Sequence, residues 1–351
     1  MKIQKHTATM LLTASLLIAA TSCRAQTVSK VYDSRIIENV TRLSPEVSGY
    51  VQDGHETSVY VWRDSLALVF NHADGDKCKD VMETFLLEDF SPAGTYLPFG
   101  SGPGQFFYVL TALKGDSLVV FDIVKKQVLA SSLGAAEEGR IMDTSSAVSV
   151  SYISQALAMY GDRLLLLNPR YFEGPDGRSN HQPLLVMTDT LLQWTVPETE
   201  YFPTNVVKGS LAADPGKGKV FFFDSYSATA CLYAGDMRRP LMQLLGPGLD
   251  KPEYMFVTGQ DGTVSVYHES TPATHYVDAV SDGMQVIAAY RDGNGGDFLF
   301  RFDWDGNLLD IFRLEGHVRT LSLSMDGSAV YVWEESVEEN PAARLCRYRL
   351  R

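Results

Sequence analysis

The sequence predicts an all-β protein whose single domain is a β-propeller, with six blades. Short runs rich in Val, Phe, Tyr and Leu recur from Ser58 to Leu350, while long amphipathic helices are nearly absent. Glycine turns recur at irregular intervals of roughly 45–65 residues, which suits four-stranded blades with loops of variable length. No linker rich in Ser, Gly or Pro divides the chain after about residue 30, so one large domain is expected.

The first residues have the order of a secretion signal. Lys2 and Lys5 precede an apolar run, Met10 to Ala20, which is far shorter than the ~20 residues that span a bilayer. Small residues then lead to Cys23. We therefore expect a signal peptide at residues 1–22, a short tether at residues 23–30 and the propeller at residues 31–351.

The segment that ends at Cys23 resembles a lipobox, in which signal peptidase II cuts before a cysteine that carries a diacylglyceryl group. Thr21 and Ser22 fit this pattern, whereas Ala20 stands where leucine is usual. The resemblance implies lipidation of Cys23 and an anchored protein of the bacterial cell envelope, either periplasmic or surface-facing. Ordinary cleavage near Ala25 is the alternative and would give a soluble periplasmic protein. Two or three acyl chains would hold the protein firmly, because each buried methylene contributes about 0.8 kcal/mol.

The chain is acidic, with 43 Asp and Glu against 30 Lys and Arg and a net charge of −13. Nucleic acid is not an expected partner, because phosphate binding needs a clustered basic face. The acidity suits solubility first, and calcium or cationic ligands second.

The predicted strands lie between turns rich in Gly, Asp and Asn. In chain order they are Ser58–Trp62, Ser117–Ile123, Arg163–Asn168, Lys219–Asp224, Thr263–His268, Phe298–Asp303 and Ala329–Trp333. The glycine turns are expected to mark one blade each, since two-residue hairpins need a positive φ that glycine adopts at little cost. These glycines are Gly54, Gly115, Gly161, Gly218, Gly262 and Gly327.

Counting each glycine turn once gives six blades, and an additional Asp282-Gly283 turn leaves five or seven open. A second class of hairpin, at Asp303–Asn307 and Thr188–Thr190, is predicted to join outer strands. An early strand within Val28–Val40 is expected to complete the last blade beside Leu345–Leu350.

One glycine-rich stretch resembles a family signature. Gly100-Ser101-Gly102-Pro103-Gly104-Gln105-Phe106 looks like the G-x-G-P-G-E/Q-F pattern of the TolB-like six-bladed β-propeller lipoproteins of Bacteroides-type bacteria. Leu245-Gly246-Pro247-Gly248, followed by Pro252-Glu253-Tyr254, is similar to a degenerate second copy. The resemblance implies a six-bladed fold and an envelope location, and it implies no catalytic residues. We expect the motif residues to be structural, in a tight turn that leads into a strand at Phe106–Leu110.

The usual sequence signals of catalysis and metal binding are missing, so no catalytic residue and no metal ligand is nominated. The glycine loop lacks the GxxxxGK[ST] order, no serine has GxSxG spacing, and no histidines have HxH or HExxH spacing. No cofactor is expected, and calcium is the alternative. For the strongest calcium candidate, the segment Asp303–Asn307, a solvated hairpin turn is favoured over a calcium site. The calcium candidates are Asp74, Asp76, Asp303, Asp305 and Asn307.

After Cys23 the cysteines are Cys78, Cys231 and Cys346. Cys231 and Cys346 lie in apolar runs, so buried free thiols are expected, and one disulfide is left open.

The longest aromatic and polar loop, residues 168–178, is the candidate ligand-binding segment, with packing on its own blade as the favoured alternative. Its candidate contacts are Arg170, Tyr171, Phe172 and Arg178. We expect a non-enzymatic binding or scaffolding propeller for an envelope protein or saccharide, attached to the membrane through its N-terminal lipid. The alternative is a propeller hydrolase or lyase acting on a lactone, glycan or peptide, with an acidic or calcium site in the central channel.

Overall fold

The computed structural model describes most of the expected propeller domain. The described residues are 27–51, 56–71, 80–134, 148–149, 156–161, 163–168, 172–173, 179–180, 184–187, 208–235, 240–248, 254–258, 260, 264–268, 270–271, 273–335 and 343–350. The expected signal peptide, Cys23 and Cys78 lie outside them. The described part is built from strands, with one short 3₁₀ helix, η1, at Ser34–Ile37. It contains no helix long and apolar enough to cross a membrane.

The first two blades are antiparallel sheets in which strands consecutive in sequence lie side by side. Blade 1 consists of β4 (Glu56–Trp62), β5 (Leu66–Asn71), β6 (Asp80–Leu86) and β7 (Pro92–Pro98). Blade 2 consists of β8 (Val109–Lys114), β9 (Ser117–Asp122), β10 (Gln127–Ser132) and β11 (Val148–Ser149).

The next two blades differ in how much of each sheet is described. Blade 3 has three described strands, β12 (Ala156–Tyr160), β13 (Arg163–Asn168) and β16 (Leu184–Met187). Blade 4 contains β17 (Gly209–Asp214), β18 (Lys219–Asp224), β19 (Thr229–Ala234) and β20 (Pro240–Leu245), and β1 (Val28–Val31) pairs parallel to β20 as a fifth strand.

The last two blades also take strands from the N-terminal segment. Blade 5 contains β23 (Tyr276–Ser281), β24 (Val286–Arg291), β25 (Asp297–Phe302) and β26 (Leu308–Arg313), and β2 (Thr41–Arg42) pairs parallel to β26. Blade 6 contains β27 (His317–Leu323), β28 (Ala329–Glu335) and β29 (Ala343–Arg349), and β3 (Glu46–Val51) completes it antiparallel to β29.

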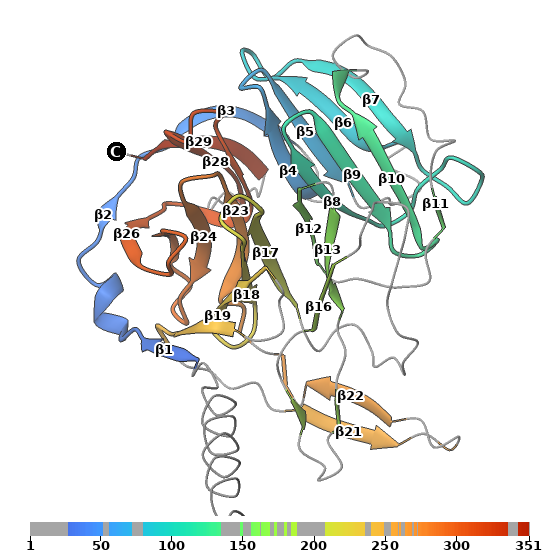
Figure 1. Ribbon diagram of the computed structural model, residues 1–351. Coiled ribbons are helices and arrows are strands. Elements are labelled where there is room, and N and C mark those ends of the chain that lie inside the picture. The colour runs from blue at the N-terminus through green and yellow to red at the C-terminus, as the bar shows by residue number, and fades with distance from the viewer. Residues whose placement is uncertain are drawn as a thin grey trace, which may run out of the picture.

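The first strand of each blade lies at the axis of the ring. Five neighbouring pairs, β8 with β12, β12 with β17, β17 with β23, β23 with β27 and β27 with β4, lie side by side. The ring closes between β4 and β8, where Ser58 Oγ lies 2.9 Å from Thr111 Oγ1 and the Tyr60 hydroxyl donates to the Thr111 carbonyl at 2.7 Å. The structure therefore confirms the predicted β-propeller (Figure 1). Within the described residues, the six first strands β4, β8, β12, β17, β23 and β27 follow one another around the axis.

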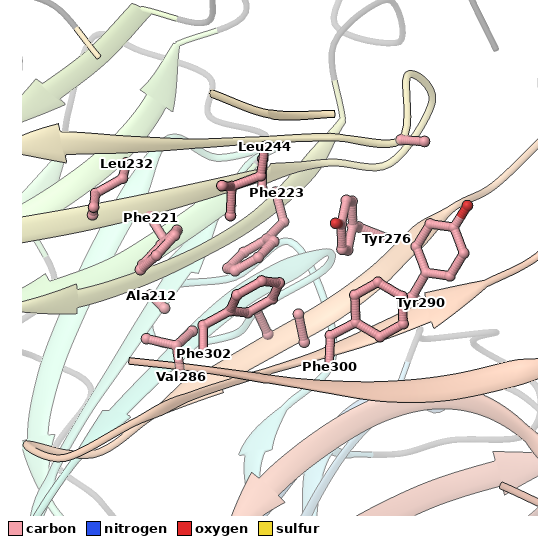
Figure 2. Packing of buried hydrophobic residues seen from close by; sticks show 14 of the residues in the cluster. Ala212, Phe221, Phe223, Leu232, Leu244, Tyr276, Val286, Tyr290, Phe300 and Phe302 are labelled. Carbon is pink, nitrogen blue, oxygen red and sulfur yellow. The ribbon is translucent and has the colours of Figure 1, made fainter. Parts of the chain in front are cut away.

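The cores lie between successive sheets, because each sheet can bury both faces only against its neighbours. Figure 2 shows the aromatic cluster between blades 4 and 5, where Phe221 and Phe223 of β18 face Phe302 of β25. The ring centroids of Phe221 and Phe302 are 6.0 Å apart, and those of Phe223 and Tyr276 are 5.1 Å apart. All four side chains are fully buried.

The N-terminal segment forms a strap across three blades. It pairs first with β20 of blade 4, then with β26 of blade 5, and last with β29 of blade 6. The expected closing strand within Val28–Val40 is therefore corrected: β3, at Glu46–Val51, closes blade 6, because the earlier residues continue the outer edges of two other blades. The expected boundary between tether and propeller, after residue 30, falls inside β1.

Four of the six glycine turns join the first two strands of a blade, as predicted, and the other two do not. Gly115, Gly161, Gly218 and Gly327 have positive φ and each joins the first two strands of a blade. Gly54 precedes β4, whose own hairpin uses Arg63 and Asp64 at φ 49°, and Gly262 lies in a separate hairpin, β21 (Tyr254–Thr258) with β22 (Val264–His268). The Asp282-Gly283 turn, expected to be additional, is the inner hairpin of blade 5.

Candidate functional site

The two ends of the ring differ in the length of their loops. At one end, here called the turn end, short turns join the first and second strands of the blades, and neighbouring turns touch. Arg63 pairs with Asp116 at 2.7 Å, the Met325 amide donates to Asp64 at 3.3 Å, and the Gln285 side chain donates to the Gly327 carbonyl at 2.9 Å. These contacts join turns of blades 1, 2, 5 and 6, so their inner strands run in the same direction.

The opposite end, here called the loop end, carries three of the long connections, while the connection between β10 and β11, residues 133–147, belongs to the turn end. A chain that alternates direction within each sheet must place two kinds of connection at the loop end: those between second and third strands, and those between one blade and the next. The predicted ligand-binding loop (between β13 and β16), the glycine-rich motif (between β7 and β8) and the β21–β22 hairpin (between β20 and β23) therefore leave the ring at the same end. Figure 1 shows the β21–β22 hairpin standing apart from the blades.

The glycine-rich motif forms the predicted tight turn. The side chain of Gln105 folds back over it and accepts a hydrogen bond from the Gly102 amide at 2.6 Å. A Cβ atom on Gly100 or Gly102 would come within 2.4 or 2.8 Å of this amide group. The Lys125 ammonium donates to the carbonyls of Gly102 and Gln105 at 2.8 and 2.5 Å, and Phe106 is fully buried. The strand itself begins at Val109 rather than at Phe106.

The second copy of the motif occupies the equivalent place in blade 4, directly after β20. The Gly246 amide donates to the Ala228 carbonyl at 3.0 Å, and a Cβ at Gly246 would lie 2.3 Å from the carbonyl oxygen of Tyr32 in the strap. Both copies therefore follow the fourth strand of a blade and direct the chain toward the next one.

The connection between β13 and β16, which includes the candidate ligand-binding loop, contains a small hairpin of β14 (Phe172–Glu173) with β15 (Ser179–Asn180). The structure places Phe172 in β14, while Arg170, Tyr171 and Arg178 lie outside the described residues. Strands β13 and β16 are direct neighbours, so this loop is an insertion in one hairpin of blade 3.

The inner strands carry polar side chains in the half of the ring nearer the loop end. Ser58, Tyr60 and Thr111 form the contact between blades 1 and 2 described above. Burial raises the pKa of the Tyr60 hydroxyl, its hydrogen bond to Thr111 opposes that shift, and the charge of Asp278 adds to it. Tyr60 therefore stays protonated and acts as a donor.

Asp278, whose charge acts on Tyr60, connects three blades. From β23 its carboxylate accepts the amides of Ala279 and of Leu321 in blade 6, both at 2.8 Å, and it takes part in a hydrogen bond with Ser210 of blade 4. Burial raises its pKa to about 6, and these hydrogen bonds oppose the shift. The Asp278 carboxyl therefore keeps its proton to a higher pH than an exposed aspartate does.

The described residues do not assemble a metal site. Nowhere in them do three or more His, Cys, Asp or Glu side chains group to hold an ion. Asp303, Asp305 and Asn307 form the predicted hairpin turn, in which Asp303 Oδ1 accepts the Asp305 and Asn307 amides at 2.9 and 2.8 Å. Lysine ammonium groups lie beside this turn, Lys30 at 2.8 Å from Asn307 and Lys219 at 2.6 Å from Asp305. Asp74 and Asp76 lie outside the described residues.

The described cysteines and histidines have structural surroundings. Cys231 and Cys346 are buried free thiols, as expected, and burial raises the pKa of each, to about 12 for Cys231. The His275 ring is buried, with Nδ1 lying 3.3 Å from the Arg291 carbonyl. His317 Nδ1 lies 3.5 Å from the buried carboxylate of Asp297.

Sequence reasoning missed two carboxylates that join blades, one half-buried and one buried. Asp278 was one, and Asp297 was another, with a two-point ion pair to Arg291 at 2.8 Å and an acceptor contact to the Val318 amide at 2.6 Å. Their signal is an aspartate inside or at the start of an apolar strand, Tyr276–Ser281 for one and Asp297–Phe302 for the other. A charged residue in such a place needs a buried partner.

The chain matches no family model, and no curated protein matches it. Among solved structures it is similar to U3-55K, with 13% identity over 87% of this chain and 98% of that one at a TM-score of 0.52. It is also similar to the WD40 repeats of RRP9, with 14% identity over 89% and 100% of the two chains and the same TM-score. A candidate exported protein from Bacteroides fragilis shares 12% identity over 93% and 100%, at a TM-score of 0.48.

These likenesses concern the fold. At such low identity, U3-55K and the RRP9 repeats show that the whole described ring is a β-propeller and say nothing of ligands. The similar structures include WD40 propellers, so they agree with the predicted architecture at a coarser level than the TolB-like resemblance.

Proposed function

We propose that this chain is an exported, lipid-anchored protein of the bacterial cell envelope whose propeller binds or scaffolds an envelope protein or saccharide. The observation that carries the proposal is the gathering of the candidate ligand-binding loop, both glycine-rich motifs and the β21–β22 hairpin at the loop end of one closed ring. Loops held on a rigid scaffold are the usual place of binding in such folds.

The scaffold is held rigid by contacts between blades. Thr320 Oγ1 and Ser322 Oγ of blade 6 accept the amides of Val59 and Val61 of blade 1 at 3.1 and 2.8 Å. Asp278 connects blades 4, 5 and 6 in the same way. A preorganised ring lowers the entropy that its loops lose on binding a partner, which favours a recognition role.

The envelope location and the TolB-like assignment rest on the sequence. The lipobox-like segment at Cys23 supports lipidation, and the signal-like residues before it support export. The two glycine-rich motifs support the TolB-like assignment, because they occupy equivalent places three blades apart.

A propeller hydrolase or lyase is the second candidate, and Asp278 is the observation that favours it. Its pKa of about 6 would let it act as a general base at neutral pH on a lactone, glycan or peptide. Its oxygens are, however, engaged by two backbone amides and a hydrogen bond with Ser210, which gives it a role in joining blades.

The test of the leading proposal has two parts. Cells that express the full chain are fed an alkyne-tagged palmitate, and the tag is expected on the wild type and lost in Cys23→Ser. Envelope extracts are then cross-linked to the wild type, to a loop-end variant (Arg170→Ala with Tyr171→Ala) and to a turn-end control (Met284→Ala with Met325→Ala), whose methionines are 80% and 74% exposed.

A binding module would retain an envelope protein or saccharide in the wild type and the turn-end control, and lose it in the loop-end variant. Capture of no envelope partner, together with robust turnover of a defined lactone, glycan or peptide, would show that the enzyme alternative is the better reading.

A further inference from the structure

The outer strands beside the N-terminus expose apolar side chains. On β1 these are Val28, 53% exposed, and Val31, 66% exposed, and the strand next to β1 adds Leu241, 42% exposed. On the outer part of blade 5, Leu309 is 49% exposed. We call these four residues the rim patch. Val28 and Val31 point to opposite faces of β1, because side chains alternate along a strand, so the rim patch flanks the outer edge of the sheets and is not a single face. Exposed apolar side chains along an edge suit contact with a partner or a membrane.

The strap fixes the N-terminal segment to this rim from its first described residue. Thr27 Oγ1 donates to the Pro240 carbonyl at 3.0 Å, and Val28 pairs with Met242 in the sheet. The Lys30 ammonium reaches blade 5, donating to the Gly306 carbonyl at 3.0 Å and to Asn307 at 2.8 Å. The segment is thus held on two blades and does not swivel at β1.

The length of chain between the anchor and the rim is short. Cys23 and Thr27 are four residues apart in the sequence. A fully extended chain spans at most about 3.6 Å per residue, so Thr27 stays within roughly 14 Å of a lipid-modified Cys23. The part of the ring next to Thr27 would therefore stay close to the bilayer.

From this geometry we propose that the rim patch lies against the membrane surface, so that the propeller stands on the outer edge of blades 4 and 5. This inference rests on the proposed lipid anchor at Cys23. It deepens that proposal by giving the protein an orientation, in which the ring axis runs along the membrane and blades 1 and 2 are farthest from it. The loop end then opens sideways, where neighbouring envelope molecules can reach it.

The chain offers a matched pair of positions for the test. Leu241, on blade 4, and Leu86, on blade 1, are both 42% exposed and lie on opposite sides of the six-bladed ring. Leu241→Cys and Leu86→Cys are made separately in a Cys78→Ser background, because Cys231 and Cys346 are buried and their thiols are unreactive. Each lipidated full-length protein is labelled with a nitroxide and reconstituted in phosphatidylethanolamine and phosphatidylglycerol vesicles.

The readout is the accessibility of each label to a water-soluble paramagnetic quencher, measured on vesicles recovered by flotation. We expect vesicle binding to reduce accessibility severalfold at position 241 and to leave it unchanged at position 86. In soluble Cys23→Ser protein the two positions should not differ. Inserting ten Gly and Ser residues after Gln26 should remove most of the protection at position 241, because the longer tether releases the rim from the surface.

Two results would overturn the inference and point to different faults. Protein that floats with the vesicles while both labels stay equally accessible would show that the anchor exists and the rim patch does not face the bilayer. Wild-type protein that fails to float would show that the lipid anchor is wrong, and the orientation would be rejected with it.

Discussion

At the scale of single residues, the carboxyl of Asp278 gives the protein a pH dependence. Its pKa is raised by burial from an ordinary 3.8 to about 6, so the folded state prefers the protonated form. The stability that this group contributes is therefore fully present below about pH 4 and is lost as the pH rises through 6. We expect the free energy of unfolding to fall by about 1–3 kcal/mol between pH 5 and pH 8 from this residue, measured by urea unfolding.

The control for this prediction is Asp278→Asn, which keeps the shape of the side chain and cannot ionise. Its stability should depend less on pH between 5 and 8 than that of the wild type. Parallel pH profiles for the two proteins would mean that solvent screens Asp278 and that its ionisation does not influence folding.

Gly246 is the second residue whose role can be measured. Both Gly246 and Gly115 have positive φ, at 94° and 57°, so alanine at either position meets backbone strain of about 1–2 kcal/mol. Only at Gly246 would the new Cβ also meet a backbone oxygen, that of Tyr32 at 2.3 Å, whereas nothing lies within 4 Å at Gly115. Gly246→Ala should therefore lose about 1–3 kcal/mol more than Gly115→Ala in urea unfolding. Equal losses would indicate that the strap moves away freely.

The motif glycines could be predicted from the sequence, while the partners of Asp278 could not. A glycine-rich turn is local, and its Gln105 is only three residues from Gly102. Asp278 depends on Ser210 and Leu321, which are brought to it by two other blades. Long-range pairs of this kind follow from the order of the blades around the ring, and a local sequence pattern does not show that order.

At the scale of elements, strands were predicted nearly to the residue where apolar side chains alternate with polar ones or form a continuous run between turns. Arg163–Asn168 and Lys219–Asp224 match β13 and β18. The assignment of hairpins to blades was less successful, since the Gly262 hairpin looks like a blade hairpin and stands outside the ring. A blade hairpin differs from the β21–β22 hairpin only in its packing, and packing depends on which sheet lies next to each strand.

One buried ion pair within blade 5 also links β25 to β27 of blade 6, beside the apolar packing between the two blades. Asp297, with its side chain 1% exposed, pairs with Arg291 and accepts the Val318 amide. Asp297→Asn should lower the free energy of unfolding by about 3 kcal/mol, because it leaves Arg291 and the amide without a full partner.

A matched aspartate in the same blade provides the control. Asp310 pairs with Arg301 at 2.9 Å, and its side chain is 44% exposed. Asp310→Asn should cost less than about 1 kcal/mol, because water screens exposed pairs. A loss at Asp310 as large as that at Asp297 would mean that burial does not decide the strength of these pairs.

At the scale of the whole molecule, the strap and the closing strand have separable roles. Removing residues 1–42 takes β1, η1 and β2 but leaves blades 4 and 5 with four strands each. Removing residues 1–51 also takes β3 and reduces blade 6 to three strands with an open edge.

We expect the shorter deletion to give a folded monomer with a lower melting temperature and the longer one to aggregate. Size-exclusion chromatography and thermal circular dichroism would measure both. A monomeric, cooperatively unfolding protein after the longer deletion would show that the ring does not need β3 for closure.

The pairing of β3 with β29 in blade 6 also sets the order of the folding steps. Glu46 of β3 pairs with Arg347 of β29, so the contact that seals the ring joins segments roughly 300 residues apart. Blades 1 to 5 can assemble before the last strand is available, but the seal must wait for the last few residues. Until then, the edge of β29 stays unpaired and exposed, together with the place that β3 takes in blade 6.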